Sequence, residues 1–346
     1  MPDCLMTSFR VLAMILALAL VPAGAPVRGE PVPLTVVSFS TPDSAHGKRW
    51  RTFERIVRSD LGAQVELTML TGGQIGTEDN MLSSLRRGRA QMGIISVGGL
   101  APLVPELSLL AAPFLFESTA EADFVMDEVV FHAYAGLLAD KGLSLVKWED
   151  GGWHQLYART PLVWPRDLRT YRLRSSATDA TRLFLSALGA DVVVLDFGDI
   201  VSALETGLVD GGVTTSVMYR ATGLYEDAPH FTLTRHAFAP GAMLANAAWR
   251  AQTPPEVYRQ IVAALGSTAE GRAAVRQEIA ESEAYVGDLG AQIHHLTADQ
   301  RRAWSAAAAP VHRALVERIG GRAEEIYGLL LEGKAAFARG RPENRN

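Results

Sequence analysis

Short apolar segments alternate with amphipathic ones along this chain, and the alternation constrains the fold more than any other feature. In the first half, apolar segments at 34–39, 65–70 and 92–96 enclose an amphipathic segment around Trp50 and another at 77–87. A β-α-β-α-β order predicts parallel strands with helices packed on both faces of a sheet. The same order begins again after residue 152. The sequence therefore predicts an α/β protein built from two similar halves.

Helix-start signals organise the rest of the chain. The pattern Ser118-x-x-Glu121 is a capping box that predicts a helix to about residue 140. Similar signals at Thr253, Ser267 and Thr297 predict a helical C-terminal third, in which the helix at 268–289 is long for a globular domain.

One pattern occurs in both halves. The segments 85–96 and 204–216 each contain a helix end, a glycine and then a short apolar strand that runs into small residues. Gly88 and Gly207 suit left-handed helix caps. The carboxyl ends of the two strands would then face a common cleft, which is where open α/β sheets bind ligands. Coincidence is the alternative, because helix–glycine–strand sequences are common.

The N-terminus predicts export. An apolar run of about a dozen residues follows Arg10, breaks at Pro22 and ends in Ala23-Gly24-Ala25, which predicts a signal peptide over residues 1–25. An uncleaved membrane anchor is the alternative. The one cysteine, Cys4, precedes this run, so the mature chain would have no disulfide. Export without disulfides favours a bacterial periplasm.

Composition and motifs exclude several functions. The net charge is −5 and the basic residues are scattered, so nucleic-acid binding is not expected. The sequence lacks the G-x-S-x-G, H-E-x-x-H and phosphate-loop motifs. We therefore expect no enzyme activity, no cofactor and no metal site.

Arg174 is the strongest candidate for a binding residue. It lies in the short apolar strand of the stretch 167–212, and a guanidinium on a rigid strand can hold a carboxylate with two parallel hydrogen bonds. A structural ion pair with Asp167 is the alternative that spacing leaves open.

Several motifs together resemble one family. They are the D-L-x-x-x-x-x-R strand at 167–174, A-L-G-A at 187–190, Leu195, Phe197 and Asp199, A-L-x-x-G-x-V-D-G at 203–211, G-G-Q-I-G at 72–76 and P-F-L-F at 113–116. The chain resembles, from about residue 33 to 338, the extracytoplasmic solute-binding proteins of TRAP (tripartite ATP-independent periplasmic) transporters, the DctP type.

The resemblance implies a two-lobed periplasmic binding protein fold. Each lobe would hold a mixed, mostly parallel sheet flanked by helices, and hinge strands and a long helix would join the lobes. Lobe I would comprise 31–151 and about 241–285, and lobe II 152–240 and about 286–338, followed by a flexible tail at 339–346. Such a monomer would close on a small organic acid by hinge bending and deliver it to TRAP membrane permease subunits.

The resemblance also assigns ligand contacts. It implies that Arg174 clamps a carboxylate, that Phe197 stacks on the ligand, and that the first lobe contributes Glu78, Ser96 and Val97. Trp153 is expected to supply a further apolar wall.

The chain departs from the commoner family pattern at two positions. His154 stands where many members have a second arginine, and Thr214 stands where many have an asparagine. We therefore expect a monocarboxylate with an apolar or hydroxylated body rather than a doubly clamped acid. Two other functions are alternatives: a ligand-sensing binding protein for a signalling receptor, and a secreted enzyme that acts on a small carboxylate.

Overall fold

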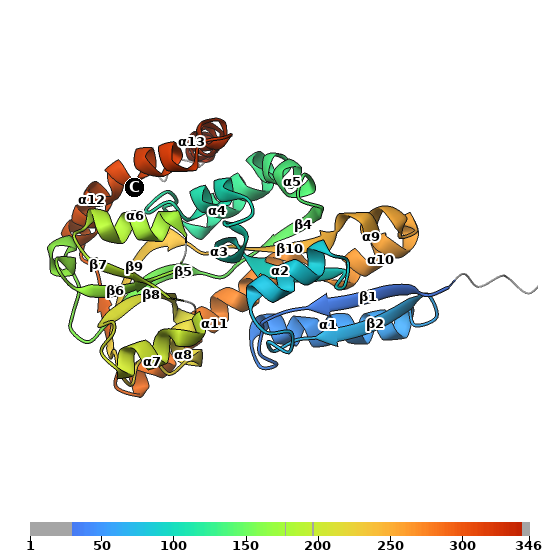
Figure 1. The fold of residues 1–346 in the computed structure, drawn as a ribbon, viewed down its shortest axis with the longest axis horizontal. Coiled ribbons are helices and arrows are strands. Elements are labelled where there is room, and N and C mark those ends of the chain that lie inside the picture. Colours follow the sequence, from blue (N-terminus) through green and yellow to red (C-terminus); the bar gives the residue numbers. More distant parts are fainter. Residues whose placement is uncertain (1–29, 177, 196, 341–346) are drawn as a thin grey trace, which may run out of the picture.

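The computed structural model describes residues 30–176, 178–195 and 197–340, apart from the side chain of Phe197. Two separate sheets organise these residues (Figure 1). The first sheet has five strands in the order β2 (Val65–Leu70), β1 (Val32–Val37), β3 (Met92–Ser96), β10 (Gly241–Asn246) and β4 (Leu143–Glu149). Strand β1 is parallel to β2 and β3, whereas β10 is antiparallel to both β3 and β4.

The second sheet has six strands. Their order is β11 (Gln292–His295), β9 (His230–Phe238), β5 (Trp153–Ala158), β8 (Gly211–Thr215), β6 (Arg172–Ser175) and β7 (Asp191–Val194). Strand β6 is parallel to β7 and β8, whereas β5 is antiparallel to β8 and β9. Two mixed sheets, each flanked by helices, confirm the predicted α/β fold class.

Helices cover both faces of the first sheet. On one face, α1 (Ala45–Asp60) and α10 (Pro255–Ala264) bury residues such as Trp50, Phe53 and Ile261 against the strands. The other face carries α2 (Glu78–Arg86), α3 (Val97–Leu100), η1 (Pro105–Ala111), α4 (Thr119–Phe124) and α5 (Phe131–Ala139). The short α9 (Ala247–Gln252) follows β10.

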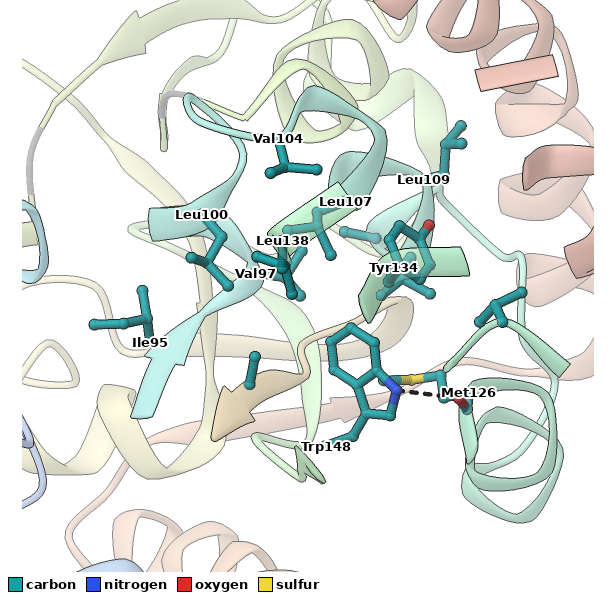
Figure 2. Packing of buried hydrophobic residues seen from close by; sticks show 14 of the residues in the cluster. Ile95, Val97, Leu100, Val104, Leu107, Leu109, Met126, Tyr134, Leu138 and Trp148 are labelled. Carbon is teal, nitrogen blue, oxygen red and sulfur yellow. Dashed lines mark hydrogen bonds between the residues drawn. The ribbon is translucent and has the colours of Figure 1, made fainter. Parts of the chain in front are cut away.

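Trp148 of β4 lies in the core of this second face (Figure 2). Its indole packs edge-to-face on Tyr134 of α5, with ring centroids 5.7 Å apart. Its Nε1–H donates to the carbonyl of Met126 at 3.0 Å. Because the buried indole finds an acceptor, it contributes apolar contact without leaving a polar group unpaired.

The second sheet is covered in the same way. Residues of α6 (Asp179–Ala187) and α12 (Ala298–Ile319) pack on one face, and residues of α7 (Ile200–Glu205) and α8 (Ser216–Ala221) pack on the other. The short turns η3 (Pro165–Leu168) and η4 (Phe197–Asp199) lie in the connections. Helix α13 (Ala323–Gly340) packs instead with the core of the first sheet, through Ala323, Ile326 and Leu330.

Two strand connections and one helix run between the sheets. The chain passes from β4 to β5 through 150–152 and from β9 to β10 through 239–240, and the Ala239 N–H donates to the Gly152 carbonyl at 2.9 Å. Helix α11 (Thr268–Asp288) runs from beside α1 to beside α8 (Figure 1). Arg276 of α11 donates to the buried carboxylate of Asp150 at 2.8 Å and also binds Asp123. These contacts fix α11 to the first connection between the sheets, at 150–152.

Two local predictions were wrong. The helix expected from residue 118 to about 140 begins at the Ser118 cap but is interrupted by a π-helical turn, η2 (Val125–Val129). Thr253 was expected to cap the start of α10, but Pro254 occupies that position. The hydroxyl of Thr253 instead donates to the carbonyl of Trp249, so Thr253 ends α9. Over the described ranges, no helix is both long and apolar enough to cross a membrane.

Candidate functional site

Arg174 lies at the edge of the second sheet where three parallel strands end. Its side chain is 7% exposed. Nε donates to the carbonyl of Leu195 at 3.1 Å and Nη1 to the carbonyl of Val213 at 3.4 Å, just beyond β7 and within β8. Backbone carbonyls thus fix the orientation of the guanidinium. The carboxylate of Asp167 accepts hydrogen bonds from the N–H groups of Val163 and Trp164.

His154 lies at the same edge, on β5. It is paired with Thr215 of β8 and with Ala237 of β9. Its Nδ1 is buried and closes no hydrogen bond with any described residue. Burial, together with the charge of Arg174, lowers the pKa of His154 from 6.5 to about 4. The imidazole is therefore neutral near pH 7 and can donate from one nitrogen and accept at the other.

A second buried histidine, His236 of β9, lies beside it. The two imidazole centroids are 6.3 Å apart. His236 stacks on Phe184 at 4.8 Å, and its Nδ1 lies 2.7 Å from the Thr234 hydroxyl. Its Nε2 is buried without a hydrogen bond in the described part of the chain. Burial, and to a lesser extent His154, lowers the pKa of His236 well below its usual range.

Tyr157 lies further into the sheet, three pairs of residues from His154 along the ladder of β5 and β8. Tyr157 is aligned with Gly212 of β8, and Gly212 is aligned with Arg174 of β6, so all three share one face. A Cβ on Gly212 would lie 2.5 Å from the Tyr157 hydroxyl. Glycine therefore lets the phenol ring cross the neighbouring strand. Among the described residues this hydroxyl has no hydrogen-bond partner, and burial raises the pKa of Tyr157.

The other predicted residues of the second sheet lie near this edge. Thr214 is buried on β8 and is paired with Gln155. Trp153 packs edge-to-face on Phe238 at 5.2 Å and also contacts the core of the first sheet. Phe197 begins η4, but its side chain lies outside the described residues.

The three predicted residues of the first half lie together at the end of β3. The carboxylate of Glu78 accepts from the N–H of Ser96 at 2.8 Å and from its hydroxyl at 2.7 Å. The Ser96 hydroxyl also caps α3 by accepting from Gly99 N at 2.9 Å. Val97 is buried in the core, and its N–H donates to the Pro240 carbonyl. In this arrangement Ser96 and Glu78 hold each other.

The segments that follow β3 and β6 approach each other at this point. A Cβ on Gly98 would lie 3.6 Å from the methyl group of Thr178, which caps α6. Around Arg174 the fold thus places the imidazole of His154 and the hydroxyl of Tyr157, both close enough for its charge to affect their pKa values. No group of three or more metal-ligating side chains was found within the described ranges.

Sequence reasoning missed His236 and Tyr157. Both lie within strands, and only the register of these strands brings His236 beside His154 and Tyr157 beside Arg174. The one available signal is the pair Gly211-Gly212, because two successive glycines in a strand indicate that another group approaches closely.

The comparisons with known proteins agree with this architecture. The model of the bacterial extracellular solute-binding proteins, family 7 (DctP), matches residues 36–319. The chain belongs to this family. The resemblance to TRAP solute-binding proteins expected from the sequence is thereby confirmed.

Relatives within family 7 span most of the chain. The C4-dicarboxylate-binding periplasmic protein DctP of Rhodobacter capsulatus is 26% identical over 311 residues, which cover 89% of this chain and 92% of the relative. The 2,3-diketo-L-gulonate-binding periplasmic protein YiaO of Escherichia coli is 25% identical, with 74% of this chain and 78% of the relative covered.

A solved structure shows the same fold. The sugar acid binding protein DctPAm from Advenella mimigardefordensis, in complex with galactonate, superposes with a TM-score of 0.80 at 24% identity, covering 88% of this chain and 99% of that chain. This match covers most of the chain and shows that the two proteins share one fold.

Proposed function

We propose that this chain is a periplasmic solute-binding subunit that captures a small organic acid and delivers it to TRAP membrane permease subunits. The observation that carries the proposal is Arg174, a buried guanidinium fixed by two carbonyls at the strand ends of a family 7 protein. Its planar fork of donors matches a carboxylate, and its charge persists at every physiological pH.

The surrounding groups favour one carboxylate rather than two. At neutral pH, His154 and His236 are uncharged, and the hydroxyls of Tyr157 and Thr214 add further neutral polar atoms. A second carboxylate would need its own cation or a set of charge-assisted hydrogen bonds to compensate its desolvation. We therefore propose a monocarboxylate with hydroxyl groups or an apolar body, walled by Trp153 and Phe197. The relatives bind acids of several kinds, C4-dicarboxylate and 2,3-diketo-L-gulonate among them.

The first half would complete the site. We propose that Glu78 and Ser96, which bind each other at the end of β3, face the ligand from this side together with the backbone at Val97. The Ser96 hydroxyl already donates to Glu78, so a ligand would meet the remaining carboxylate lone pairs. A ligand hydroxyl is the group best suited to donate to them.

Binding would proceed by hinge closure. The sequence predicts that lobe I comprises 31–151 and about 241–285 and that lobe II comprises 152–240 and about 286–338. We propose instead that lobe II ends at about residue 322. Because α13 packs on the first sheet's core, we assign residues 323–338 to move with lobe I. The crossings at 150–152 and 239–240 would take up the rotation, and Gly152, at φ 84°, provides a backbone conformation open mainly to glycine.

The remaining parts of the proposal concern location and chemistry. We propose that residues 1–25 direct export and are removed, and that the mature protein is a monomer. The bound acid would leave unaltered, because the site is proposed to bind and not to catalyse.

A ligand screen tests the proposal. Thermal unfolding would be measured with a panel of organic acids that includes hydroxylated monocarboxylates, dicarboxylates and the matching amides. A cognate ligand at 100 times its dissociation constant adds about 2.7 kcal/mol of stability. We expect a monocarboxylate to give the largest shift and its amide to give none. Equal shifts from acid and amide would contradict the carboxylate clamp, and conversion of the acid would contradict a binding role.

A further inference from the structure

The P-F-L-F turn at 113–116 places neighbouring residues in the cores of both halves of the molecule. It follows η1 and precedes α4, so its chain belongs to the first half. Leu115 and Phe116 pack accordingly in the core of the first sheet. Phe114 packs instead in the core of the second sheet, between α6 and α12. The tip of a turn from one half is thus inserted into the other half.

Side chains of the second half enclose the ring of Phe114, which is 8% exposed. The ring packs edge-to-face on Phe184 of α6, with centroids 6.3 Å apart. The guanidinium of Arg301, on α12, lies 5.4 Å from the centroid of the same ring. An aromatic pair and a cation over a ring face each add to the energy of burial. The contact is therefore more than an edge of the core.

The backbone of the turn is bound to the second half as well. The N–H of Phe114 donates to the carbonyl of His236 in β9, and His312 Nε2 of α12 donates to the carbonyl of Pro113 at 2.6 Å. Phe114 has a φ of 59°, a left-handed conformation that is unfavourable for a bulky side chain. Such a conformation persists only where the surrounding contacts hold it.

The part of β9 that receives the turn is irregular. Residues 233–236 leave the regular ladder between β9 and β5, which frees backbone groups from sheet pairing. Phe114 supplies the donor for the carbonyl of His236, and Arg301 Nη1 donates to the carbonyl of Thr234 at 3.3 Å. The turn therefore completes the hydrogen bonding of the segment that carries His236.

The turn also lies beside both crossings between the sheets. The ring of Phe116 packs edge-to-face on Phe238, with centroids 6.2 Å apart. Phe238 is the last residue of β9 and directly precedes the crossing at 239–240. It also contacts Trp153, the first residue after the crossing at 150–152, at 5.2 Å. A rotation about the crossings displaces atoms in proportion to their distance from the axis, so the turn would move least.

We propose that the turn at 113–116 is a pivot, in which Phe114 stays in lobe II while the cleft opens and closes. This inference rests on the hinge closure proposed above. Withdrawal of Phe114 would expose its ring to water and would remove the donor from the His236 carbonyl, and both changes are unfavourable. The pivot keeps His236 beside the proposed ligand site in the open and the closed state. A latch, in contrast, would form only on closure.

Amide hydrogen exchange of the ligand-free mature chain, resolved by residue, tests the pivot. The amide of Phe114 is compared with that of Ala239, which donates to Gly152 between the two crossings. We expect protection factors within about tenfold of each other, because both bonds persist when the cleft opens. Protection at Phe114 that is weaker than this overturns the pivot and makes the turn a latch.

Crystal structures of the ligand-free chain and of its complex with the acid selected by the thermal screen give a second measurement. The lobes should rotate while the centroids of Phe114 and Phe184 stay near 6.3 Å apart. Separation of these rings in the open form overturns the pivot but not acid binding. An acid that binds without any rotation of the lobes overturns hinge closure, and the pivot with it.

A substitution tests whether the ring holds the turn. Phe114→Ala should lower protection of the amide at 114 by about tenfold or more. Phe131→Ala is the matched control, because it removes a half-buried phenyl ring that packs on the first sheet's core, and it should leave this amide unchanged. Unchanged protection in folded Phe114→Ala would contradict the pivot. If that variant fails to fold, exchange in the unsubstituted chain and the two crystal structures decide.

Discussion

Replacement of Arg174 is the most direct test of the proposed binding mode. Its side chain is 7% exposed and held by the carbonyls of Leu195 and Val213, so a carboxylate bound to it would be desolvated. Truncation of one side of such a pair costs about 2–5 kcal/mol. Arg174→Ala should therefore weaken binding of the acid selected by the screen by roughly 30- to 4,000-fold. Isothermal titration calorimetry measures this loss.

Two companion variants separate binding from structure. Arg174→Lys should rescue affinity poorly, since an ammonium cannot reproduce two parallel hydrogen bonds. Arg172→Ala is the matched control on the same strand, because that side chain is half exposed and pairs with Asp191 at the surface. It should change stability by less than about 1 kcal/mol and affinity not at all.

One result would refute the reasoning. If folded Arg174→Ala binds the acid as tightly as the parent chain, the guanidinium serves only to join β6 to its neighbours. Loss of melting temperature in the ligand-free variant reports that structural share, because the two carbonyls lose a donor.

Three further predictions follow from contacts near the site and the hinge. The pKa of His154 is about 4 in the folded state against 6.5 in the unfolded state. Because the unfolded chain binds the proton more readily, the free energy of unfolding should fall by about 3 kcal/mol as the pH drops from 6.5 toward 4. His154→Asn should flatten this pH dependence in urea unfolding, and an unchanged profile would argue against a buried neutral imidazole. Gly212→Ala should lower the free energy of unfolding by about 1–3 kcal/mol because the new methyl group crowds the Tyr157 hydroxyl, and adding Tyr157→Phe should recover part of this loss. Chemical denaturation measures both variants, and strictly additive effects would show that residues 157 and 212 do not touch. Arg276→Met should lower the stability of the protein by about 3 kcal/mol, because the fully buried carboxylate of Asp150 loses its cation. Adding Asp150→Asn to this variant should restore part of the lost stability. Calorimetric melting of the single and double variants measures both effects, and no recovery in the double variant would count against the Arg276–Asp150 ion pair.

The sequence predicted the architecture because local signals and periodicity agree. Gly88 and Gly207 were expected as left-handed caps, and both have φ of 70°. The strands after them, β3 and β8, belong to different sheets, as the repeated pattern indicates. Ser267 and Thr297 cap their helices as predicted, and the Thr297 capping box is complete.

The site was less accessible to sequence reasoning because it depends on register and on tertiary contacts. His236 becomes a neighbour of His154 only through the pairing of β5 with β9, which no local pattern encodes. The interruption of the helix after Ser118 and the packing of α13 on the first sheet's core likewise arise from long-range contacts. The roles assigned to Arg174 and its neighbours stay predictions until ligand binding is measured.

The position of β10 has a consequence for how the molecule is made. This strand lies between β3 and β4, in the interior of the first sheet, although some ninety residues of the other sheet's chain are synthesised before it. The first sheet therefore cannot acquire its central hydrogen bonds until residue 246 has left the ribosome. Pairing across such sequence separations is slow, because a long loop must close before the contacts repay its entropy. With this topology the first sheet stays incomplete until more than two thirds of the chain has been synthesised, and the second sheet waits longer still, for β11.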